Sequence, residues 1–151
     1  MRIFSARYAA LTLASLLPAA AVVADPQGLL PYRDADAVAQ GQALYADHCA
    51  ACHGARLEGE PDWRARDEDG YLPAPPHDVT GHTWHHPDAQ LFDITKYGIE
   101  AIVGNGYKSR MMGYEHVLSD DEILSILAFI KSTWPEGVIA RHDQLNRVAG
   151  N

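Results

Sequence analysis

The chain has 151 residues, which is enough for one domain of ordinary size. It carries 20 acidic and 12 basic side chains, so its formal net charge at pH 7 is −8. A chain this acidic is a poor candidate for binding nucleic acid, and none is expected as a partner. If charge steers the encounters of this protein, its partners are expected to have a basic docking face.

The first 24 residues have the pattern of an export signal. Arg2 and Arg7 precede an apolar run over residues 8–23, and Ala24 ends a small-residue cleavage signature. The short run and its central Pro18 favour cleavage over retention as a membrane anchor, which is the alternative interpretation. Such an uncleaved anchor is the one membrane contact that the sequence allows for.

Residues 25–151 are predicted to form a single domain, with a core over about residues 35–135. After cleavage this chain has 10 basic and 20 acidic side chains, a formal charge of −10. An irregular leader over 25–33 comes first. A helix then starts at Asp34 or Asp36, either of which can cap it, and Gly54 closes it.

This helix ends in the most specific motif of the chain. Cys49 and Cys52 are its only cysteines, and His53 follows the second one directly. The pattern Cys-x-x-Cys-His attaches a c-type haem, because each thiol bonds one vinyl group and the histidine binds the iron. We therefore predict one covalent haem c. Since this haem is attached outside the bacterial cytoplasm, motif and export signal both indicate the periplasm.

Residues 55–86 show little periodicity and are rich in proline and glycine. A stretch of this length without regular structure normally argues against a compact domain, but a haem offers an apolar face on which such a loop can pack. A second helix is expected from Pro87 to Gly98, then a short turn over 99–103 and a loop over 104–106.

The clearest helix signal begins at Ser119. Ser119 and Glu122 have the spacing of a capping box, an apolar stripe follows at helical spacing, and Pro135 stops the helix. A last helix through Val138 and Leu145 is also expected.

These features together resemble the class I cytochromes c, which are small exported electron carriers. Residues 41–54 are similar to the first helix and haem site of that family, and residues 118–131 to its last helix. The resemblance covers about residues 35–135. It implies an all-α cytochrome c fold, in which the N- and C-terminal helices cross around the haem. By resemblance, Gly41 and Tyr45 meet Phe129 at this crossing.

The resemblance also implies that a methionine in the loop before the last helix is the second axial ligand of the iron. Met111 stands seven residues before Leu118 and Tyr114 has the aromatic position, so Met111 is the first choice. Met112 occupies the place where the family usually has proline. It remains the alternative ligand, because a flexible loop can present either methionine sulfur.

Two further contacts with the haem site are expected by resemblance. A prolyl carbonyl after the motif accepts a hydrogen bond from the axial histidine, and Pro75 or Pro76 is the candidate, with Pro73 behind. Trp84 is the most family-like donor to a haem propionate, since an indole N–H tolerates burial. The alternative donors are Tyr71, Arg56, Arg64, Tyr107 and Lys108.

Four histidines lie within ten residues of the irregular stretch, namely His77, His82, His85 and His86. They form either a copper or zinc site or a set of side chains that line the haem, cap the next helix or face solvent.

The predicted function is single-electron transfer between redox proteins by a monomeric periplasmic cytochrome, which is not itself an enzyme. The first alternative is a haem enzyme or gas-binding protein with an open axial position. The others are a thiol-disulfide oxidoreductase and a structural zinc site, which the sequence favours less.

Overall fold

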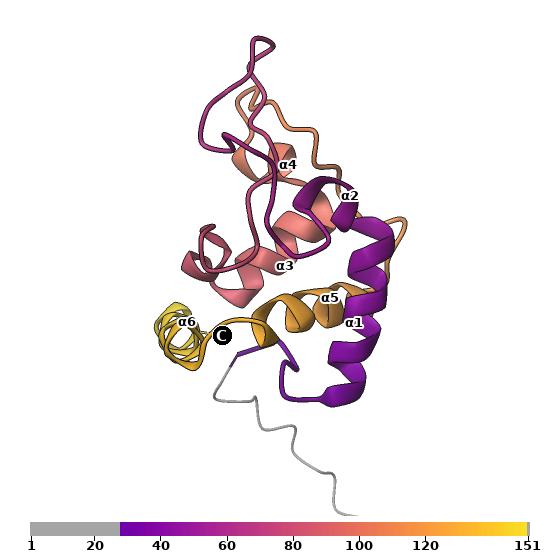
Figure 1. Ribbon diagram of the computed structural model, residues 1–151, viewed down its shortest axis with the longest axis vertical. Coiled ribbons are helices and arrows are strands. Elements are labelled where there is room, and N and C mark those ends of the chain that lie inside the picture. Colours follow the sequence, from indigo (N-terminus) through magenta and orange to yellow (C-terminus); the bar gives the residue numbers. More distant parts are fainter. Residues whose placement is uncertain (1–27, 151) are drawn as a thin grey trace, which may run out of the picture.

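The computed structural model describes residues 28–150, so the predicted signal segment lies outside the described residues. Figure 1 shows a helical molecule with long loops at one end. The described part has six α-helices and one short 3-10 helix and no β-strand, which confirms the all-α prediction. They are α1 (Ala35–His48), α2 (Ala50–His53), η1 (Thr83–His85), α3 (Asp88–Tyr97), α4 (Ile99–Val103), α5 (Asp120–Ser132) and α6 (Glu136–Ala149).

Helices α1 and α5 cross to form the main core (Figure 1). A Cβ atom on Gly41 would collide with the carbonyl oxygen of Ser125, so only glycine lets the two backbones come this close. One turn further along α1, the ring of Tyr45 packs on that of Phe129 with 5.5 Å between centroids. The contact expected at the crossing is therefore present.

Local signals place the ends of these helices. The side chain of Asp34 accepts hydrogen bonds from the backbone N–H groups of Asp36 and Ala37, so Asp34 is the N-cap of α1. Ser119 and Glu122 form both halves of a capping box at the start of α5. Helix α3 begins at Asp88, one residue later than predicted, so Pro87 is its N-cap. Gly98 ends that helix with a φ of 83°.

Helix α6 docks on the rest of the molecule through polar side chains. His142, Asp143 and Asn146 are all buried on its inner face, beside the half-buried Val138 and Ile139. The expected last helix is therefore present, but apolar periodicity alone does not describe the face that it buries.

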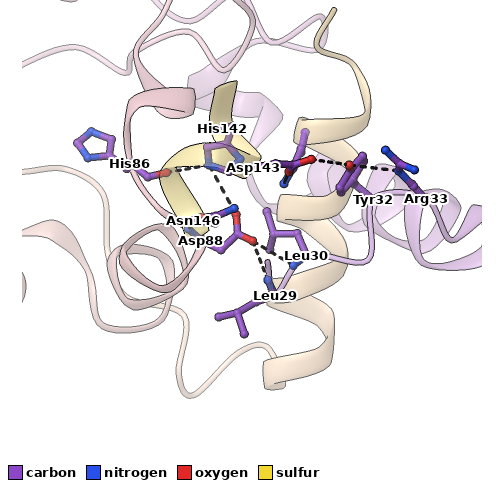
Figure 2. A network of polar contacts seen from close by, with 10 residues as sticks. Leu29, Leu30, Tyr32, Arg33, His86, Asp88, His142, Asp143 and Asn146 are labelled. Carbon is purple, nitrogen blue, oxygen red and sulfur yellow. Dashed lines mark hydrogen bonds and ion pairs between the residues drawn. The ribbon is translucent and has the colours of Figure 1, made fainter. Parts of the chain in front are cut away.

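The centre of the docking network is the fully buried carboxylate of Asp88, at the start of α3 (Figure 2). It accepts the backbone N–H of Leu29 at 2.7 Å and that of Leu30 at 3.3 Å. The backbone N–H of Asp88 donates to the Asn146 side chain at 2.8 Å, and the Nε2 atom of His142 lies 3.6 Å from the carboxylate. Asp88 thus joins the first described residues to the last helix.

A second contact, between Tyr32 and Asp143, also joins the first described residues to α6 (Figure 2). Asp143 of α6 pairs with the buried Lys131 of α5 at 2.6 Å and accepts the hydroxyl of Tyr32 at 3.0 Å. Because both charged groups lie out of water, each is held in place by the other.

Among residues 28–150, no helix has the length and apolar character needed to cross a membrane.

Candidate haem site

The end of α1 presents the cysteines and the histidine of the motif. The backbone N–H of Cys49 still donates to Tyr45 at 2.9 Å, but Cys49 leaves the ideal helical conformation and separates α1 from α2. The backbone N–H of His53 then donates to the Cys49 carbonyl at 2.9 Å. Gly54 ends the turn with a φ of 80°, and its carbonyl accepts the Tyr45 hydroxyl at 2.9 Å. One helical turn thus carries all three groups of the motif.

Both thiols are free, with Cys52 exposed and Cys49 half-buried. Burial raises the pKa of Cys49 to about 11, and the neighbouring Cys52 acts in the same direction. A cysteine that attacks disulfides instead has a lowered pKa, because the thiolate is the nucleophile. The site therefore does not favour thiol-disulfide exchange.

The imidazole of His53 is buried, and its Nδ1 atom lies 2.8 Å from the carbonyl oxygen of Pro75. A carbonyl only accepts, so Nδ1 is the nitrogen that carries the proton and Nε2 has the free lone pair. Burial lowers the pKa of His53, and the Pro75 carbonyl opposes this effect. A neutral imidazole with its lone pair on Nε2 is the form that binds a metal ion.

The carbonyl of Pro76 has a different partner, the Thr83 hydroxyl at 3.5 Å. Of the neighbouring prolines considered for this role, Pro75 is the one that the structure brings to His53.

The four clustered histidines do not gather into one site. His77 stacks on the ring of His53, His82 stacks on Trp63 and meets His86 edge-on, and His85 packs on Trp84. Loss of water around the His77 ring lowers its pKa well below the usual value. No set of three or more His, Cys, Asp or Glu side chains within residues 28–150 is arranged to hold a metal ion. The described structure therefore does not support the copper or zinc site, nor a structural zinc site at the cysteines.

Met111 and Met112 lie in the segment between α4 and α5. Met111 is half-buried, and its backbone N–H donates to the Ser109 hydroxyl at 2.9 Å. The side chain of Met112 points outward, with 64% of the residue exposed. This difference favours Met111 as the residue that faces an axial position, but the assignment remains a prediction.

Contacts that the sequence did not predict hold this segment in place. Arg110, directly before Met111, pairs with Asp67 at 2.7 Å and lies over the ring of Tyr71 at 4.2 Å. The ammonium group of Lys108 donates to the Asp69 carbonyl at 2.8 Å. The long loop over 55–86 and the methionine segment are therefore joined side by side, and no sequence pattern predicts this contact.

Trp84 lies in η1, where its ring contacts His85 and the guanidinium of Arg141. Its indole N–H is buried, and no group within the described residues accepts a hydrogen bond from it. A buried donor without an acceptor is costly, so this nitrogen is suited to an anionic group that completes the site.

The residues present therefore fit a covalently attached haem. Two free thiols stand at the required spacing, an imidazole is held with Nε2 available, and a buried indole donor is unpaired among the described residues. Cys49, Cys52 and His53 would hold the group, with Met111, Pro75 and Trp84 as the further contacts.

Comparison with known proteins agrees with this geometry. The family model of cytochrome c matches residues 38–134, which is more than half of the chain. The chain therefore belongs to the cytochrome c family, whose members carry haem c covalently and serve in haem-based electron transfer. The all-α structure is accordingly a cytochrome c fold.

One curated relative is the cbb3-type cytochrome c oxidase subunit FixP of Azorhizobium caulinodans. It is 26% identical over 94 residues, which cover 62% of this chain and 28% of the relative. The match thus spans under a third of the length of that protein. The search of solved structures gave no significant match.

Proposed function

We propose that this protein is a periplasmic monohaem cytochrome c that carries single electrons between redox proteins. The proposed ligands are His53 and Met111, with the haem bonded to Cys49 and Cys52. A covalently held haem supplies an iron ion that alternates between the ferric and ferrous states. The hydrogen bond from His53 Nδ1 to the Pro75 carbonyl carries this proposal, because it leaves Nε2 free for the metal.

Each of the other residues has a defined task. Met111 would hold the haem iron through its thioether, which would raise the reduction potential and keep small molecules from the iron. The buried indole N–H of Trp84, which has no acceptor among the described residues, would donate to a carboxylate of the cofactor. Because the side chains of His53 and Met111 would both hold the iron, little rearrangement would accompany a change of its charge.

The acidic chain favours partners with a basic face. The name of the relative suggests one class of partner to test, a terminal oxidase that takes electrons from a cytochrome domain.

The test is expression with the native export signal in a bacterium that attaches c-type haem. We expect a pyridine haemochrome spectrum of c type and haem that stays with the denatured chain, both lost in Cys49→Ala/Cys52→Ala. Carbon monoxide should bind the ferrous protein poorly at pH 7. Ready binding would support the alternative, a haem enzyme or gas-binding protein with an open axial position. A protein without covalent haem would refute both.

A further inference from the structure

The imidazole rings of His53 and His77 stack on each other. Their centroids are 4.1 Å apart and their planes differ by 25°. His53 ends α2, whereas His77 belongs to the long loop, so the fold brings the two rings together from separate segments.

His77 is held by contacts on its backbone and its ring. Its backbone N–H donates to the Leu57 carbonyl at 2.8 Å, and its Nδ1 atom lies 2.8 Å from the Thr83 hydroxyl oxygen. Its carbonyl accepts the indole N–H of Trp134 at 2.8 Å. The ring of Tyr45 also meets it edge-on, at 6.2 Å. The His77 ring is therefore a fixed surface rather than a mobile side chain.

The hydrogen bond to Pro75 does not fully fix the ring of His53. It directs one nitrogen, but the ring still tilts about the line of that bond, because the acceptor geometry at a carbonyl is broad. A flat group parallel to one face restricts this tilt. Because hydrogen bonding to a ligating histidine controls its strength as a ligand, a change in this tilt also changes how the histidine acts on the iron.

We propose that His77 is a positioning residue for the axial ligand: its stacked ring sets the orientation of the His53 imidazole and thereby adjusts the reduction potential. This inference rests on the proposed function, because it takes His53 as the iron ligand. In this arrangement Thr83 and Trp134 support the axial histidine indirectly through His77.

The experiment compares His77→Leu and His77→Phe with the wild-type holoprotein. Leucine fills much of the space without a flat ring, whereas phenylalanine restores a ring that can stack. For His77→Leu we expect at least a threefold change in the redox equilibrium with a fixed mediator, about 28 mV for a one-electron couple. We also expect altered g values in the ferric electron paramagnetic resonance spectrum, which report ligand orientation. His77→Phe should return both readings towards wild type.

The matched control is His82→Leu, the same substitution at a half-buried histidine of the same loop, whose ring meets Trp63 and His86 and not His53. It should leave the g values unchanged. If His77→Leu destroys folding, Thr83→Val frees the ring without removing it and should shift the same spectrum.

Wild-type potential and g values in His77→Leu, or in Thr83→Val where only that variant folds, would overturn the inference. A c-type haemochrome in the same samples would show that the proposed function stands even then. Absence of covalent haem from the wild-type protein would instead remove the proposed function itself.

Discussion

The hydroxyl of Tyr114 donates a 2.8 Å hydrogen bond to the backbone carbonyl of His48. This contact ties the methionine segment to the end of α1, one residue before the haem motif begins. The backbone of Tyr114 also donates to Thr95 of α3 at 3.1 Å. Two sides of the proposed haem site are therefore connected by one tyrosine.

Tyr114→Phe should weaken the closure of the methionine segment. Loss of one partly buried hydrogen bond costs about 1 kcal/mol, which corresponds to about a fivefold larger open fraction. Carbon monoxide titration of the ferrous variant should show about fivefold tighter apparent binding than wild type. An unchanged affinity would mean that this hydrogen bond does not hold Met111 in place.

Met111→Ala should remove the sulfur-to-iron charge-transfer band of the ferric protein, while Met112→Ala should keep it. The reason is that Met112 is largely exposed, whereas Met111 is half-buried beside the anchored Arg110. Near-infrared and visible spectra of the two ferric variants show whether the band is present. Each variant serves as the control for the other. The reverse result would assign Met112 as the ligand.

Gly41→Ala should destabilise the protein strongly. The new methyl group would meet the Ser125 carbonyl at the crossing of α1 and α5, and overpacking of this kind costs about 3 kcal/mol. The matched control is Gly137→Ala in α6, where no atom lies within 4 Å of the added Cβ apart from the chain neighbours and the adjoining backbone of the helix itself. That variant should be about 0.5 kcal/mol more stable than wild type. Urea unfolding measures both, and equal effects would contradict the account of the crossing.

His142 should make the stability of the protein depend on pH. Burial lowers its pKa, while the His86 carbonyl and the carboxylates of Asp88 and Asp143 oppose this and Lys131 adds to it. The unfolded chain therefore binds a proton more readily than the folded one. The stabilisation is complete above about pH 6.5 and is lost as the pH falls from there through the folded pKa.

Urea unfolding between pH 7 and pH 5 tests this. We expect His142 to contribute a slope of at most about 1.4 kcal/mol per pH unit. The slope should shrink in His142→Leu, although that variant is less stable at pH 7. The exposed His116 provides the control, and His116→Gln should keep the wild-type slope. An unchanged slope in His142→Leu would assign the whole effect to other groups, such as His77, whose pKa is also lowered by burial.

Elements with local signals were predictable from the sequence. The capping box at Ser119 and Glu122 and the terminating Gly98 each depend on residues a few positions apart. The sequence offered Asp34 or Asp36 as the cap of α1, and the structure has Asp34. The haem motif is equally local, since three residues within one helical turn define it. The crossing of α1 and α5 followed from the family resemblance.

Other features depend on contacts that periodicity does not record. Helix α6 buries His142, Asp143 and Asn146, so its inner face does not appear as an apolar stripe. The pairing of Arg110 with Asp67 joins two loops, and no regular spacing marks either partner. Likewise the stack of His77 on His53 depends on where the long loop returns. Such contacts are set by the folded chain as a whole.

The network around Asp88 couples the local unfolding of the first described residues to that of the last helix. Tyr32 and Asp143 are 111 positions apart, yet they share a hydrogen bond, and Asp88 binds both segments as well. Chain ends usually fray independently and at little cost. Here release of the last helix also removes the partners of the first described residues, so cleavage by a protease near either end should loosen the other.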